Sequence, residues 1–231
     1  MNGHLLAVHL VDGVLKPQWW IGGWLGTGLL LAATAWRVEA EEIPRLALVS
    51  AACFIASSIH IPLPMTSVHL LLNSLAVLLA GWRAPWAIFP ALLLQALLLN
   101  HGGLLALGVN TLVYTLPAWA VWASAQWVLR LFPTWTRLGW AWLIGGLLGG
   151  ITALATVALH AAVLYLGGLE TWPQLVALVF LAHLSVVGVE ACINASLLTF
   201  LLRVKPTLLA LPHATKAETA FLACAEPARR P

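Results

Sequence analysis

The chain has 231 residues, of which 61% are hydrophobic and 8% are charged, and its formal net charge is +3. Soluble domains carry about 25% charged residues, so this composition excludes a water-soluble globular fold and requires lipid as the main solvent. The few basic residues lie between apolar runs rather than on one face, which excludes a nucleic-acid-binding surface. We therefore expect an all-α polytopic membrane protein.

Seven apolar runs have about the 17–25 residues that a transmembrane helix needs. They cover residues 20–36, 44–59, 67–82, 84–100, 104–129, 138–166 and 173–202. The sixth and seventh are long for one crossing, so they are expected to tilt or kink. In this prediction residues 1–205 form one transmembrane domain. The Pro-, Ala- and Thr-rich residues 206–231 form a disordered cytoplasmic tail.

The Lys and Arg residues predict the orientation, because these residues are enriched in cytoplasmic segments. With the N-terminus outside and the C-terminus in the cytoplasm, Lys16 is the only one of the 11 Lys and Arg residues on the outer side. Arg37 directly follows the first run, which argues against a cleaved signal peptide. Tryptophans at the ends of the runs fit an interfacial belt.

Glycines four residues apart occur in two of the runs. The pairs are Gly22 and Gly26 in the first run, and Gly145 with Gly149 and Gly146 with Gly150 in the sixth. Small residues at this spacing let two helix backbones approach closely. Two interpretations stay open, namely packing within the chain and docking against a partner membrane subunit.

Most of the eight histidines fall on the outer side of the predicted topology. His60, His69 and His101 lie in or beside outer segments, and His160 and His183 lie in the outer halves of the last two runs. The orientation is set from Lys and Arg alone, so this clustering is independent evidence for an outward-facing polar site. Imidazole binds Ni, Co, Cu and Zn, so the set indicates a transition-metal site. For His160 and His183 taken singly, the alternative is a hydrogen-bond bridge between helices.

Glu190 is an ionisable residue deep in the seventh run. It follows His183 by seven residues, which places both on one helix face. An intramembrane carboxylate is a candidate functional group. The alternative is a neutral or paired structural anchor, and the sequence leaves the two open.

A short polar stretch interrupts the apolar runs and contains Gln95, Asn100, His101, Gly102, Gly103 and Asn110. The pattern H-G-G-L-x-x-L-G-x-N, preceded by L-x-Q-A-L-L-L, resembles the CbiM/NikM family. These proteins are the substrate-binding membrane subunits, or S components, of cobalt and nickel uptake systems. The resemblance is strongest over residues 95–111 and 9–20.

Proteins of that family begin Met-His-Ile-x-[Asp/Glu]-Gly-Phe-Leu, and the similar stretch here runs from His9 through Asp12 and Gly13 to Leu15. Val8 then stands at the place of the initiator methionine. The codon GTG encodes valine internally but methionine at a bacterial start. We therefore expect the protein to begin at position 8, with residues 1–7 a start-site artefact.

A histidine in second position is a strong chelator. The free amine of residue 8, the amide nitrogen of His9 and its imidazole can bind one ion together, in a planar arrangement that suits Ni(II), Cu(II) or Co(II). In the family a remote ligand comes from an S-H-P-T-G run after an Ile-Pro turn. The resemblance assigns that place to His69, although leucines replace Pro-Thr-Gly here and the spacing is one residue shorter.

The residues around these ligands are expected to support them. We interpret His101, Gly102 and Gly103 as a lid on the N-terminal segment, with His101 as a weaker ligand; an ordinary tight turn is the alternative. Gln95, Asn100 and Asn110 are expected to form a hydrogen-bonding shell. Asp12 and Gly13 are expected to form the turn that positions His9, the alternative being a solvated turn.

The resemblance implies the capture subunit of an energy-coupling-factor importer for Co²⁺ or Ni²⁺ in a bacterial or archaeal cytoplasmic membrane. No Walker loop is present, so the implied partners are a membrane T component, two ATPase subunits and a separate small accessory membrane subunit. The metal is substrate, and neither an organic cofactor nor enzymatic activity is expected. The rival is a membrane-embedded haem-binding or redox protein that uses His160 and His183 as bis-histidine ligands. A purely structural membrane protein is a third reading, which the outer histidines disfavour.

Overall fold

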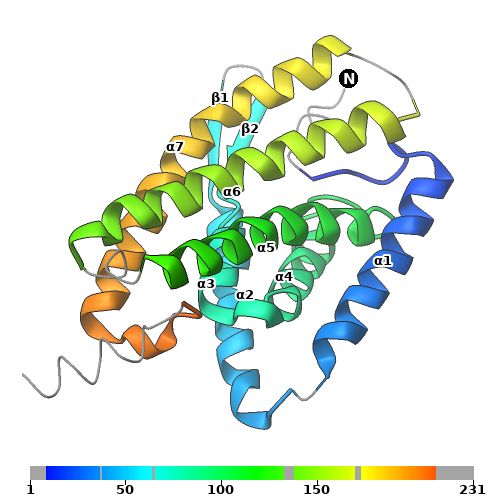
Figure 1. The fold of residues 1–231 in the computed structure, drawn as a ribbon. Helices are drawn as coiled ribbons and strands as arrows, with labels where there is room; N and C mark the ends of the chain where they lie inside the picture. The colour runs from blue at the N-terminus through cyan, green and yellow to red at the C-terminus, as the bar shows by residue number, and fades with distance from the viewer. Residues whose placement is uncertain (1–8, 37, 64–65, 133–137, 170–172, 212–231) are drawn as a thin grey trace, which may run out of the picture.

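The computed structural model describes residues 9–36, 38–63, 66–132, 138–169 and 173–211. Within them the chain forms a helical bundle with one small hairpin (Figure 1). The α-helices are α1 (Pro17–Ala35), α2 (Ile43–Ser58), α3 (Asn73–Ala80), α4 (Pro85–Leu98), α5 (Leu107–Leu131), α6 (Leu138–Gly167) and α7 (Pro173–Val204). The strands are β1 (His60–Leu63) and β2 (Thr66–His69), and the short 3-10 helices are η2 (Ala40–Glu42), η3 (Gly81–Arg83) and η5 (Pro206–Leu208). Val8 and residues 1–7, together with most of the predicted tail, lie outside the described residues.

Prolines begin several of these helices. α1, α4 and α7 start at Pro17, Pro85 and Pro173, where the missing N–H group of proline leaves no helical hydrogen bond unmade. Six of the seven predicted runs are helices, and their ends differ from the prediction by three residues at most. The prediction of a predominantly α-helical protein is therefore right for these segments.

The predicted helix over residues 67–82 is wrong. Its first residues form β2, which pairs antiparallel with β1 and places His69 opposite His60. Only Asn73–Ala80 is helical, and eight residues extend about 12 Å along a helix, which is too short to cross a bilayer.

The reason for this break lies just before α3. Leu72 adopts a left-handed conformation with φ of 47°, and the amides of Leu71 and Leu72 donate to the carboxylate of Glu190. The apolar character of this run predicts a continuous helix. Instead, the amides of Leu71 and Leu72 donate to Glu190 of α7 rather than to carbonyl groups within a helix.

Small residues fix the packing of α6 on α7, which lie side by side (Figure 1). A Cβ atom on Gly145 would lie 2.6 Å from the carbonyl oxygen of Asn194, and one on Gly149 would lie 2.7 Å from that of Glu190. The glycine pattern of the sixth run therefore serves packing within the chain. In α1, a Cβ on Gly26 would meet Leu112 of α5, whereas Gly22 has nothing within 4 Å.

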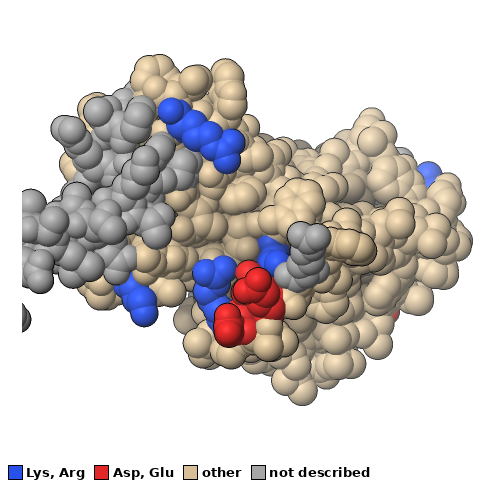
Figure 2. Space-filling model, turned by 60° about the horizontal axis from the view of Figure 1, so that its bottom comes forward, with Lys and Arg blue, Asp and Glu red and all other residues tan. Residues whose placement is uncertain are grey.

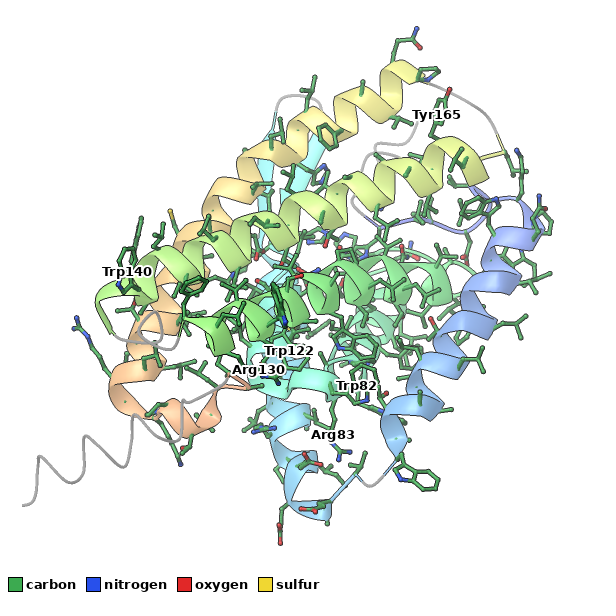
Figure 3. All side chains as sticks on the ribbon, viewed as in Figure 1. Trp82, Arg83, Trp122, Arg130, Trp140 and Tyr165 are labelled. Atoms are coloured by element: carbon green, nitrogen blue, oxygen red, sulfur yellow. The ribbon has the colours of Figure 1, made fainter. Side chains whose placement is uncertain are left out.

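Charged side chains gather at one end of the bundle, which Figure 2 brings forward. There Arg83 Nε contacts Glu42 Oε2 at 2.9 Å, and the ring of Trp82 lies parallel to that of Trp119 with 4.3 Å between centroids. Arg83, Trp82 and Arg130 lie toward this end, and Tyr165 lies at the far end of α6 (Figure 3).

The residues after α7 close the same end. The Ala210 amide donates to the carbonyl oxygen of Leu78 at 2.7 Å. The Trp122 indole N–H donates to the Ala210 carbonyl oxygen at 2.8 Å. This closing segment, residues 206–211, therefore ties the C-terminal side of α7 to α3 and α5.

Within the described part of the chain, two helices are long and apolar enough to cross a membrane by length and composition, over Gly139–Gly167 and Phe180–Val204. Pro85–Leu98 is a shorter apolar helix.

Candidate metal centre

His69 stands at the end of β2, in the interior of the bundle, and only 2% of it is exposed. Its Nδ1 lies 3.0 Å from the carbonyl oxygen of Leu70. A proton on Nδ1 donates a hydrogen bond to that oxygen, and Nε2 is then the ring atom that can bind a metal ion.

Glu190 holds the backbone that follows His69. Its Oε1 accepts hydrogen bonds from the amides of Leu71 at 2.5 Å and Leu72 at 2.9 Å. The Asn194 amide group lies 3.5 Å from Oε2, and Glu190 is completely buried. In the structure this carboxylate is therefore a paired anchor between α7 and the His69 turn.

The N-terminal segment enters the bundle beside His69. Asn110 of α5 fixes it with a reciprocal pair of hydrogen bonds: the Leu10 amide donates to Asn110 Oδ1 at 3.0 Å, and Asn110 Nδ2 donates to the Leu10 carbonyl oxygen at 2.9 Å. His9, the preceding residue, is 4% exposed. The centroids of its ring and that of His69 are 4.8 Å apart, with 12° between the planes.

Tyr114 also lies beside His9, with 5.3 Å between ring centroids and 7° between planes. Its hydroxyl is buried and finds no hydrogen-bond partner among the described residues. Sequence reasoning missed this residue, because a tyrosine inside an apolar helix carries no pattern that separates it from ordinary core or interface aromatics.

The glycine turn lies against the N-terminal segment. Gly102 has φ of 77°, and a Cβ there would be 3.2 Å from His9 Cβ. A Cβ on Gly103 would collide with the carboxylate of Asp12. Asp12 Oδ1 accepts a hydrogen bond from the Ala106 amide at 3.0 Å, so the two loops lock together.

Other predicted supporting residues are placed differently. Gln95 is buried, donates to Ser57 Oγ and lies beside the His9 ring. Asn100 is exposed and ends α4 in a left-handed conformation with φ of 52°. Gly13 also has a positive φ, of 83°. His101 is half-buried, and its amide donates to the Gln95 carbonyl oxygen at 3.1 Å.

Burial is the main electrostatic influence on His9. It lowers the pKa of the imidazole well below its ordinary value of 6.5, and the neighbouring His69, His160 and His101 lower it further, against a smaller opposing effect of Gln95. His9 is therefore neutral near pH 7, which is the form that binds a metal.

His160 and His183 are both buried, at 3% and 0% exposure. They lie on α6 and α7, where His160 follows Thr156 by four residues and His183 precedes Glu190 by seven. Near them, Asn73 Nδ2 donates to Thr156 Oγ1 and to the carbonyl oxygen of Tyr114, both at 2.8 Å.

The described side chains of His, Cys, Asp and Glu form no group of three or more with metal-binding geometry. Among the described residues, the rings of His9 and His69 lie next to each other, with 4.8 Å between their centroids. Metal–imidazole bonds are about 2.0–2.1 Å, so two rings at this separation can reach one ion when further donors complete the set.

These features describe an apolar helical bundle with two imidazoles close together in its interior. The chain belongs to the CbiM family, described as the cobalt uptake substrate-specific transmembrane region, whose model matches residues 9–208. The family resemblance of the polar stretch and the N-terminal segment is thus confirmed, and the family is described as a component of cobalt uptake.

The chain is 35% identical over 202 residues to a protein of Haemophilus influenzae named for metal transport, covering 87% of this chain and 97% of that protein. It is 33% identical to the cobalt transport protein CbiM of Sorangium cellulosum, covering 69% and 73%. It is 29% identical to the fused nickel transport protein NikMN of Rhodobacter capsulatus, covering 91% and 66%.

Solved structures are also similar. A crystal structure of a truncated transition metal transporter matches with a TM-score of 0.65 and 25% identity, covering 84% of this chain and 98% of that one. The haem-binding alternative finds no support in any of these comparisons.

Proposed function

We propose that this chain is the substrate-capture subunit of an energy-coupling-factor importer, and that it binds Co²⁺ or Ni²⁺ from the outer side of a cytoplasmic membrane. The observation that carries this proposal is the meeting of His9 and His69, two buried imidazoles from segments 60 residues apart, with 4.8 Å between their centroids. The lowered pKa of His9 keeps its imidazole neutral and available as a ligand.

The remaining donors come from the backbone in this proposal. If the native chain begins at Val8, its free amine and the His9 amide nitrogen join the two imidazoles in a planar set of four, which suits Ni(II) and can hold Co(II). His101 is a weaker ligand or an outer support. Amino-terminal sequencing of the native protein tests the start, and a native terminus at Met1 contradicts it.

Equilibrium dialysis of purified protein against Ni(II) and Co(II) tests the site. His9→Ala and His69→Ala are each expected to abolish binding, and His101→Ala is expected to weaken it. His213→Ala removes a histidine from the tail and serves as the control with unchanged binding. Unchanged affinity in both of the first two variants overturns the proposed site.

The orientation and the partners are part of the same proposal. The charged end of the bundle (Figure 2) faces the cytoplasm, and all seven helices belong to the membrane domain. Separate T and ATPase subunits, with a small accessory membrane subunit, power uptake; relatives are named as a fused NikMN and a fused CbiMQ protein.

Cells that express this chain with and without the ATPase subunits test this arrangement. Uptake of radioactive nickel or cobalt is expected only with the ATPases. A fluorescent protein fused after residue 231 should fluoresce, because that end is cytoplasmic. Equal uptake without the ATPases contradicts the partnership, and a dark but stable fusion contradicts the orientation.

A further inference from the structure

Two buried histidines are not used by the metal site proposed above. His160 lies on α6 and His183 on α7, helices that pack along each other (Figure 1). On α6, His160 lies between Gly149 and the C-terminal end of the helix, and on α7, His183 lies before Glu190, whose carbonyl oxygen meets Gly149. Neither histidine is more than 3% exposed. An imidazole pair in the interior of a membrane bundle calls for a physical explanation.

A hydrogen-bond bridge between helices does not account for His160. Its Nδ1 is buried and finds no hydrogen-bond partner among the described residues. A buried ring nitrogen without a partner costs free energy, and such atoms are rare in native proteins. A ligand at Nδ1 removes this cost, and neutral imidazole is the commonest protein ligand for metal ions.

The contacts between α6 and α7 bring His160 and His183 close to the same level of the bundle. Gly149 meets Glu190; His160 lies about three turns beyond Gly149 on α6, and His183 lies about two turns before Glu190 on α7. The turn after His69 contacts both helices, because the Leu71 amide donates to Glu190 and Asn73 donates to Thr156, one turn before His160. His69, His160 and His183 therefore lie in the same part of the interior.

We propose that His160 and His183 form a second binding position for a divalent transition-metal ion, adjacent to His69. This inference rests on the proposed function, because the ion is the one captured at His9 and His69. Glu190 stays outside the second position, since its Oε1 is engaged by the amides of Leu71 and Leu72.

Two imidazoles are an incomplete ligand set for Ni(II) or Co(II), so water completes it and binding there is weaker than at the first position. A weak position beside a strong one has a physical use. The ion can exchange ligands one imidazole at a time, and it never has to pass through the apolar interior without ligands.

The experiment replaces both histidines with residues that separate metal binding from hydrogen bonding. The double variant His160→Gln with His183→Gln keeps buried hydrogen-bonding groups but supplies poor metal ligands. The double variant His160→Cys with His183→Cys supplies good ligands for these metals, as thiolates. All proteins are kept reduced and titrated with Ni(II) or Co(II) alone in equilibrium dialysis.

The wild-type chain is expected to bind one ion tightly and a second at least tenfold more weakly. The Gln pair is expected to lose the second ion and keep the first. The Cys pair is expected to regain it, and Co(II) should then show thiolate-to-metal absorption in the near ultraviolet. A second ion that the Gln pair retains, or a wild-type chain that binds one ion only, overturns the proposal.

The His9→Ala variant distinguishes this failure from failure of the proposed function. If His9→Ala loses the tightly bound ion while the wild-type chain binds no second ion, the proposed site at His9 and His69 is retained. Only the proposed position at His160 and His183 is then rejected. Where a double variant does not purify as a monodisperse species, the single variants His160→Gln and His160→Cys carry the same comparison.

Discussion

The metal centre and the α6–α7 pair are held together in different ways. α6 and α7 are neighbours in sequence. They meet at glycines of α6, where backbone carbonyl groups of α7 occupy the space that a side chain would need. The centre joins segments about a hundred residues apart through single polar contacts, such as Asn110 with Leu10 and Glu190 with Leu71. We infer that substitutions in the first region act on folding, whereas those in the second act first on the metal ligands.

A large effect on stability is expected at Gly149. In Gly149→Leu the new Cβ would lie 2.7 Å from the Glu190 carbonyl oxygen, so α6 and α7 must separate, at a cost of about 1–3 kcal/mol or more. Thermal unfolding in detergent measures this. Gly22→Leu is the control, since nothing lies within 4 Å of its Cβ position. Equal melting temperatures of the two variants contradict the assigned role of the glycine contact.

Glu190→Ala tests the anchor between the two regions. It leaves the Leu71 and Leu72 amides without their acceptor, which costs roughly 1–3 kcal/mol for each buried group. The His69 turn loosens, and metal affinity is expected to fall by about 10–100-fold. Glu190→Gln keeps an acceptor oxygen and should restore part of both. Full affinity in Glu190→Ala would show that His69 is positioned without α7.

A smaller effect on stability but a clear one on affinity is expected at Asn110. Asn110→Ala removes both hydrogen bonds to Leu10, which frees the segment that carries His9. We expect metal affinity to fall roughly tenfold or more. The melting temperature should fall by less than in the two variants above, because the freed N-terminal segment can move out to water. Asn110→Asp keeps the acceptor and loses the donor, so its affinity should lie between the two. Dialysis against Ni(II) compares all three proteins.

The smallest effect concerns pH in the metal-free protein. Burial lowers the pKa of His9 in the folded state, so the unfolded chain binds its proton first as the pH falls. Stability is therefore complete above pH 6.5 and declines below it, by at most about 1.4 kcal/mol per pH unit. His9→Ala should flatten this decline in melting curves at pH 7.5 and 5.5. An equally steep decline in His9→Ala assigns it to other groups.

The same division between local and distant contacts decides what the sequence can predict. The helices follow from apolar runs with prolines at their beginnings, and Asn110, Gly102 and Asp12 are polar or flexible residues in an apolar setting. The turn at Leu70, Leu71 and Leu72 is not predictable from hydropathy, because a carboxylate more than a hundred positions later determines it.

The role of Glu190 stayed open in the sequence for a related reason. A carboxylate in a membrane helix looks the same whether it binds a substrate or two amides, and only its partners distinguish the cases. For Asn100, polarity alone was misleading. It suggested a hydrogen-bonding role in the interior, whereas the structure places this residue in an exposed position just after α4.

The two ends of α3 are fastened to parts of one continuous segment. Glu190 of α7 grips the residues before the helix, and Ala210, just beyond α7, grips Leu78 near its end. If α7 moved along its axis, both contacts would move α3 in the same direction. Binding of an ion in the interior would then shift the residues at the opposite end of the bundle by rigid-body motion, without unfolding of any helix.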